Sequence, residues 1–207
     1  MKNTNINVGK MVRLAILVAI ILVMSFTPLG YLRTPVIEIT FIMIPVAIAS
    51  IIVGPVGGAI AGCAFGITSF IQCFGASPFG AMLLSINPLY TFIMCLIPRI
   101  IAGWLPGLIY QAVIKIGKHK TAASIAASIA APVLNTVLFI VTLYALFGRT
   151  DFVRNFGESI WDGFVVIVGV NGLVEALVGI IVGAAVSRSL VHFFPGKTPA
   201  AKLEVSG

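Results

Sequence analysis

The stretch NPLYTFIMCLIPRIIAGWLPGLIYQ, from Asn87 to Gln111, decides the fold class of this protein. It is long enough to cross a bilayer as a helix, since a span needs about 20 mainly apolar residues. Near its middle lies Arg99, directly after Pro98. An arginine at this depth costs about 2.5–3.5 kcal/mol, so we expect it to face the interior of a helix bundle and to have a partner there.

Pro98 makes the position of Arg99 more unusual. Proline has no N–H, so in a helix the carbonyl oxygen of Met94 would lack its usual donor. A charge beside a free backbone acceptor within a span indicates a binding site. The alternative is a structural ion pair that holds two helices together.

The composition extends the membrane interpretation to the whole chain. Of the 207 residues, 59% are apolar and 9% are charged, whereas a soluble domain has about 25% charged residues. We predict an all-α membrane protein with six transmembrane helices in a single integral membrane domain, residues 1–207, with no room for a soluble domain. The spans are expected at about residues 11–29, 36–53, 56–74, 87–114, 121–147 and 161–190.

The basic residues predict how the spans are oriented. One side of the predicted membrane collects Lys2, Lys10, Arg13, Lys115, Lys118, Lys120, Arg188, Lys197 and Lys202. Most of the acidic residues fall on the other side. By the positive-inside rule, both termini are expected in the cytoplasm. Orientation in a lipid bilayer therefore explains the net charge of +7, and no nucleic-acid partner is expected.

Small residues recur at helical spacing in the predicted spans. Gly58, Gly62 and Gly66 share one face of the third span, which indicates close packing against another helix of the bundle. Ala15 and Ala19 form a similar pair in the cytoplasmic half of the first span. This pair is either internal packing or a contact surface for a partner protein.

The cysteines and one loop complete the apolar part of the sequence. Cys63, Cys73 and Cys95 have no C-x-x-C spacing, so we interpret them as small buried apolar residues and not as a metal or disulfide framework. The loop FGASPFGAMLLS, from Phe74 to Ser85, is rich in glycine and apolar residues and is expected outside. It is either a lid or a loop that rests on the membrane surface.

Polar side chains at membrane depth are concentrated in the last three predicted spans. Besides Arg99, they include Asn135 in the fifth span, and Asn171 and Glu175 on one face of the sixth. A guanidinium binds a carboxylate through paired hydrogen bonds, and asparagines suit amides and hydroxyls. We therefore predict a site for a small anionic ligand. In the alternative, Arg99 pairs with Glu175. The candidates for an aromatic wall are Tyr90, Phe139, Trp161 and Phe164.

The motifs of nucleotide-driven motors and of hydrolases are missing. The chain has no G-x-x-x-x-G-K-[ST], no H-E-x-x-H and no G-x-S-x-G. We predict that the protein is not an enzyme and that this chain binds no cofactor. An autonomous ion-coupled secondary transporter is the alternative class, with Glu175 as its protonatable group.

Two stretches of the sequence, taken in order, are similar to a known family. ITFIMIPVAIASIIVGPVGGAIAGCAFGITSF, from Ile39 to Phe70, and IPRIIAGW, from Ile97 to Trp104, look most like the pantothenate-specific branch of the energy-coupling factor (ECF) vitamin transporters. With six spans and the Ala15/Ala19 pair, nearly the whole chain resembles the substrate-binding S component of these transporters.

The resemblance implies a mechanism and a set of partners. The protein would capture a small water-soluble vitamin outside the plasma membrane of a prokaryote. It would dock through Ala15 and Ala19 on a transmembrane coupling protein with two ATPases, topple, and release the vitamin inside. The partners would bind the ATP. Arg99 would hold the carboxylate of pantothenate, and Asn135 and Asn171 its amide and hydroxyls. Riboflavin, cobalamin-type, biotin and pyridoxine ligands are the alternatives.

Overall fold

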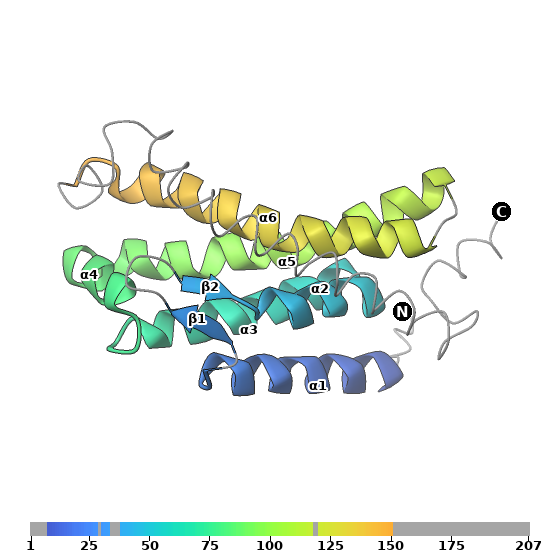
Figure 1. Cartoon of the computed structure of the whole chain (residues 1–207), viewed down its shortest axis with the longest axis horizontal. Coiled ribbons are helices and arrows are strands. Elements are labelled where there is room, and N and C mark those ends of the chain that lie inside the picture. Colours follow the sequence, from blue (N-terminus) through green and yellow to red (C-terminus); the bar gives the residue numbers. More distant parts are fainter. Residues whose placement is uncertain (1–7, 29, 34–37, 118–119, 151–207) are drawn as a thin grey trace, which may run out of the picture.

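Long helices dominate the computed structural model, which describes residues 8–28, 30–33, 38–117 and 120–150. Four of them run along the length of the molecule (Figure 1) and are long and apolar enough to cross a membrane: α1 (Val8–Ser25), α3 (Pro55–Gln72), α5 (Pro88–Gly117) and α6 (Lys120–Phe147). The shorter elements are β1 (Tyr31–Arg33), β2 (Glu38–Thr40), α2 (Met43–Ile52) and α4 (Pro78–Ile86).

The helical architecture predicted from the sequence is confirmed for this part of the chain, and the expected second span is an exception. Residues 36–53 were expected to form a single span, but Glu38–Thr40 pairs with Tyr31–Arg33 as an antiparallel hairpin. The helix begins only at Met43. Just before it, the Thr40 hydroxyl accepts a hydrogen bond of 3.3 Å from the N–H of Ile42. At about 1.5 Å per residue, α2 covers only about half of a 30 Å hydrocarbon core. The expected sixth span, residues 161–190, lies outside the described residues.

A minimal turn joins α2 to α3 at the Gly54-Pro55 pair. Gly54 has a φ of 110°, in the left-handed region that favours glycine. Pro55 is the first residue of α3, where its missing N–H costs no helical hydrogen bond. The two helices therefore reverse direction within two residues and stay in contact.

The Gly58/Gly62/Gly66 stripe of α3 packs against the backbone of α5. A Cβ at Gly58 would meet the carbonyl oxygen of Gly103, one at Gly62 that of Arg99, and one at Gly66 that of Cys95. Each step of four residues along α3 thus matches a step of four in the opposite direction along α5. Close backbone approach of this kind provides the dispersion contacts that hold helices together in lipid. The stripe also fixes the depth at which Arg99 lies.

We expect Gly62→Ala to destabilise the protein, because its methyl group would overlap the carbonyl of Arg99. Overpacking typically costs about 1–3 kcal/mol, so the midpoint of thermal unfolding in detergent should fall by several degrees. Val56→Ile adds a similar volume on the exposed face of α3 and serves as the control. An unchanged midpoint for Gly62→Ala would show that α3 and α5 are not in such close contact.

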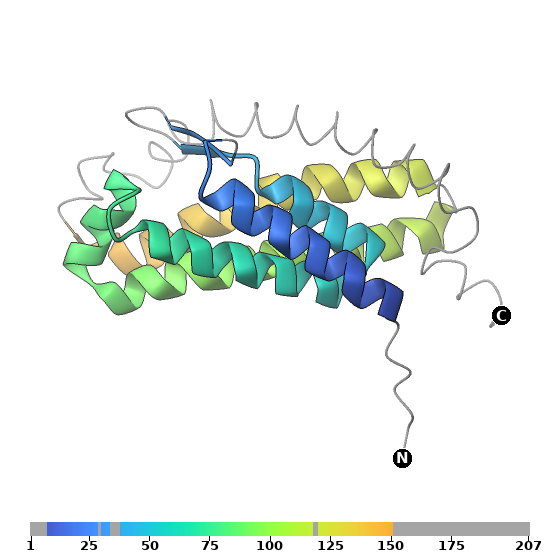
Figure 2. The same ribbon diagram turned by 90° about the horizontal axis from the view of Figure 1, so that it is seen from below.

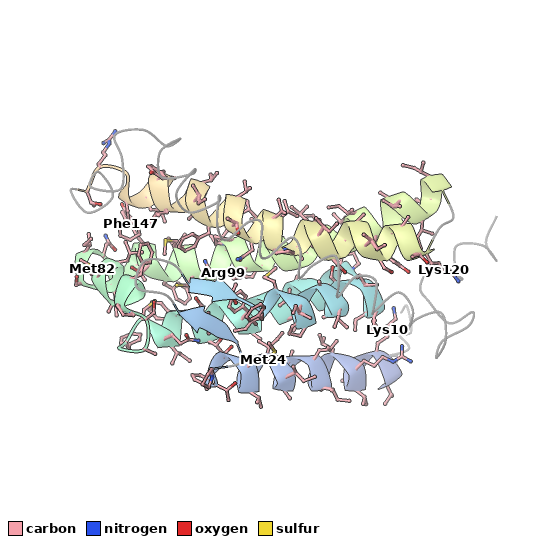
Figure 3. All side chains as sticks on the ribbon, in the orientation of Figure 1. Lys10, Met24, Met82, Arg99, Lys120 and Phe147 are labelled. Carbon is pink, nitrogen blue, oxygen red and sulfur yellow. The ribbon has the colours of Figure 1, made fainter. Side chains whose placement is uncertain are left out.

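The remaining helices pack around this α3–α5 pair. α1 lies along α2 and α3 (Figure 2), and α6 lies against α5. The main core joins every described helix except α4, through Ile21, Val46, Phe65, Ala102 and Ala131. Lys10 and Lys120 mark one end of the bundle, which we call the basic end, and Met82 and Phe147 mark the other, which we call the α4 end (Figure 3).

Candidate functional site

Arg99 lies on α5 about midway between the two ends of the bundle (Figure 3). Only 8% of its surface is exposed, so the charge is held inside the protein and does not face lipid. This location agrees with the sequence-based expectation for an arginine at membrane depth. The tight contact with Gly62 leaves its backbone little freedom to move.

The guanidinium is hydrogen-bonded to its own helix. Its Nη1 donates a bond of 2.7 Å to the carbonyl oxygen of Met94. This is the acceptor that Pro98 leaves free, because a proline cannot donate to the residue four positions earlier. Proline and arginine therefore act together: the first frees a buried carbonyl and the second satisfies it.

Two aromatic rings flank the same guanidinium. Its central carbon, Cζ, lies 4.9 Å from the ring centroid of Phe139 on α6 and 5.7 Å from that of Phe65 on α3. Both distances are within the range of about 6 Å for cation–π attraction, which strengthens when water is excluded. Phe139 is one of the aromatic wall residues predicted from the sequence, whereas Phe65 was not predicted. Its place between Gly62 and Gly66, on the helix that approaches α5, was the available signal.

Arg99 has hydrogen-bonding capacity left over. Its buried Nε has no partner among the described residues. None of the helices α1 to α6 contains an aspartate or a glutamate, so no carboxylate from these helices can neutralise the charge. An unpaired buried charge is costly, so the guanidinium is suited to bind an anion. Glu175, the predicted protein partner, lies outside the described residues.

Asn135 provides a second polar group near this position. It is 6% exposed, and its Oδ1 has no hydrogen-bond partner in the described part of the chain. It lies four residues before Phe139, so both share one face of α6 and are about 6 Å apart along the axis. The buried hydroxyls of Ser128 and Ser124, also without partners in the structure as described, continue this polar stripe towards the basic end. These three polar side chains are thus buried inside the bundle.

The other predicted site residues do not join this group in the described structure. Tyr90 is 39% exposed at the α4 end, where its ring packs edge-on at 5.9 Å against Phe147. It lies nine positions before Arg99, or about 13 Å along the helix. Trp161 and Asn171 lie outside the described residues, as does Glu175, so their roles stay predictions.

The expected outer loop contains a helix that packs next to the site. α4 starts at Pro78, and the hydroxyl of Ser77 caps it by accepting a 3.1 Å hydrogen bond from the N–H of Gly80. Phe79 of α4 contacts Phe139, with ring centroids 6.2 Å apart, and Phe139 in turn contacts Arg99. A movement of α4 would therefore change the surroundings of the guanidinium through one intermediate ring.

A second polar cluster, which the sequence did not predict, connects α1 with α3 and the hairpin. The Gln72 amide donates bonds of 3.0 Å to the carbonyl of Ser25 and 3.2 Å to the Tyr31 hydroxyl. The hydroxyls of Ser25 and Thr68 are 2.9 Å apart. Since these bonds join groups within the protein, we interpret the cluster as structural.

Comparison with known proteins decides the family. Residues 9–187 match the family model for the substrate-specific component of ECF transporters. The chain belongs to this family. It is also 32% identical, over 161 residues, to the pantothenic acid transporter PanT of Lactococcus lactis subsp. cremoris strain MG1363. The aligned region covers 73% of this chain and 76% of that relative. This agrees with the resemblance found in the sequence, and a transport protein, not an enzyme, is the class that it indicates.

As a substrate-specific ECF component, the protein has a vitamin and an ECF module as its general classes of partner. The face of α1 that carries Ala15 and Ala19 is available for such a contact in the isolated chain. Both alanines are exposed, and larger apolar side chains surround them: Val8, Met11, Val12, Ile16, Ile20 and Val23. We call this the α1 surface. The methyl groups of the two alanines lie one turn apart on it and permit close approach of another helix.

Proposed function

We propose that this protein is the pantothenate-binding subunit of an ATP-driven ECF vitamin importer. The observation that carries the proposal is the buried Arg99, whose Nε lacks a partner in the described structure while α1 to α6 offer no carboxylate. A ligand with a carboxylate group would supply the missing charge. The similarity to a pantothenic acid transporter supports this choice of ligand.

The proposed ligand has groups that suit the polar side chains of the bundle. Its carboxylate would accept hydrogen bonds from the free side of the Arg99 guanidinium. Its amide and hydroxyls would pair with Asn135, whose Oδ1 lacks a partner in the described structure, and with Asn171. Glu175 would then have to pair elsewhere, since a second carboxylate beside Arg99 would compete with the ligand. Tyr90 and Trp161 are proposed as wall residues nearer the entrance.

For transport, we propose that the basic end faces the cytoplasm, as the charge distribution predicts, with both termini on that side. The ligand would enter from the α4 end, with α4 as a lid over Phe139 and Arg99. The α1 surface would dock on a transmembrane coupling protein that carries two ATPases. These partners would bind and hydrolyse the ATP, and toppling of this subunit in the plasma membrane would release the vitamin inside.

Titration calorimetry with the purified subunit tests this function. We expect pantothenate to bind with a Kd below about 1 μM, corresponding to at least about 8 kcal/mol, without any partner subunit. Riboflavin, biotin, pyridoxine and a cobalamin serve as the comparison panel. If one of these binds more tightly than pantothenate, the proposed substrate changes, but the protein remains a vitamin-binding ECF subunit. Absence of binding to every vitamin would contradict the proposal. Uptake driven by an ion gradient without ATP would instead favour a secondary transporter.

A further inference from the structure

Two cysteines that are far apart in the sequence meet at the α4 end of the bundle. Cys73 follows the last residue of α3, and Cys95 lies on α5, one turn before Arg99. Their sulfur atoms are 3.8 Å apart. The two side chains are only 4% and 2% exposed. The spacing in the sequence indicated unrelated buried residues, and it did not predict this contact.

The packing of α3 on α5 holds the two sulfurs together. Gly66 brings the α3 backbone against the carbonyl of Cys95. Ser69 bridges the pair: its carbonyl accepts a 3.4 Å contact from the Cys73 Sγ, and its hydroxyl lies 4.0 Å from the Cys95 Sγ. A disulfide bond is about 2.05 Å long, so the sulfurs would have to approach each other by about 1.8 Å.

The sulfur of Cys73 also lies against α4. A Cβ built on Gly80 would be only 2.6 Å from it, so the α4 backbone covers the thiol directly. Between Cys73 and α4, Gly75 has a φ of 141°, a conformation in which other residues are strained. The thiol pair therefore lies at the corner where α3 turns into α4, and one turn of α5 separates it from Arg99.

We propose that Cys73 and Cys95 are a reversible redox-modification site whose disulfide ties the α3–α4 corner to α5. The inference that this restrains a lid rests on the proposed function, in which α4 covers the ligand and faces outside, where disulfides persist. The formation of the bond itself does not depend on that function. Because Gly80 covers Cys73, an oxidant reaches the pair when α4 moves away.

The chemistry is an exchange with a low-molecular-weight disulfide. The thiolate of one cysteine attacks a sulfur of that disulfide, forms a mixed disulfide and expels one thiolate. The second cysteine, after losing its proton, then attacks the protein sulfur of the mixed disulfide and expels the other. The two protein thiols lose two electrons and two protons, and the small disulfide is reduced to two thiols.

Mass spectrometry of the full-length protein in membrane vesicles tests the site. After treatment with oxidised glutathione and alkylation of the remaining thiols, we expect a linked peptide pair joining residues 73 and 95, lighter by two hydrogens than the reduced peptides. Cys63→Ser should still form the link, whereas Cys73→Ser and Cys95→Ser should not. Alkylation of both Cys73 and Cys95 in the oxidised sample, or equal linkage through Cys63, would overturn the site.

A second measurement tests the effect on the ligand. We expect oxidation to slow the release of radiolabelled pantothenate at least fivefold, and dithiothreitol to restore the original rate. The Cys73→Ser/Cys95→Ser variant should release the ligand at one rate under both conditions. If the Cys73–Cys95 disulfide forms but the release rate is unchanged, the disulfide does not restrain α4. If no pantothenate binds in either state, the proposed function fails while the result on the disulfide stands.

Discussion

Arg99→Ala is expected to weaken pantothenate binding about 100-fold, equivalent to about 3 kcal/mol, within the range for removing one partner of a buried charge pair. Without the guanidinium, the ligand carboxylate would lose its charged donor inside the bundle. The Met94 carbonyl would also lose its 2.7 Å hydrogen bond. Calorimetry with the purified variant measures the change in Kd.

One variant distinguishes the charge of Arg99 from its planar shape. A second variant tests whether removing a positive charge elsewhere on the same helix also weakens binding. Arg99→Lys keeps the charge but loses the planar fork, so an intermediate loss of affinity is expected. Lys115→Ala removes one positive charge near the end of the same helix, where the side chain is exposed, and should leave Kd unchanged. If Arg99→Ala binds within about twofold of the original protein, Arg99 is structural, and Glu175 becomes its expected partner.

The double substitution Ala15→Leu/Ala19→Leu is expected to reduce uptake at least tenfold and to leave vitamin binding by the purified subunit unchanged. Leucine at these two positions would hold the partner helix away from the α1 surface, and the dispersion contacts between the helices would be lost. Both side chains are exposed in the isolated chain, so the fold itself tolerates the added volume. Uptake by cells that contain the coupling module and calorimetry on the purified protein are the paired measurements.

The control for this variant is Val141→Leu on α6, another exposed apolar position, which should retain full uptake. Co-purification with the coupling protein gives an independent measure of docking. If uptake and binding decline together in the double variant, the alanines serve folding. If both are retained, the docking surface lies elsewhere on the protein.

Arg99 illustrates how a costly residue is accommodated in an apolar bundle. One hydrogen-bond donor satisfies the carbonyl freed by Pro98, and two aromatic rings lie against the guanidinium. These contacts come from α3, α5 and α6, so the charge also depends on the assembled bundle. The Nε left without a partner in the described helices is one of the donors that remain for a ligand.

Several features of this protein were determined by the sequence alone, because they depend on composition or on local spacing. Apolar length predicts helices such as α1, α3, α5 and α6. The four-residue period of Gly58, Gly62 and Gly66 predicts a close helix contact, and the structure supplies α5 as the partner. The consequence of Pro98 for Met94 follows from the chemistry of one proline in a helix.

Other features were decided only by the tertiary structure, because they join residues that no short-range pattern connects. Phe65 and Phe139 come from different helices and meet only at Arg99. Glu38–Thr40 pairs with Tyr31–Arg33 as a hairpin instead of forming the start of an expected span, because strand pairing satisfies backbone groups that a hydropathy pattern does not reveal. The sulfurs of Cys73 and Cys95 are neighbours because a glycine stripe brings α3 onto α5 in one particular register.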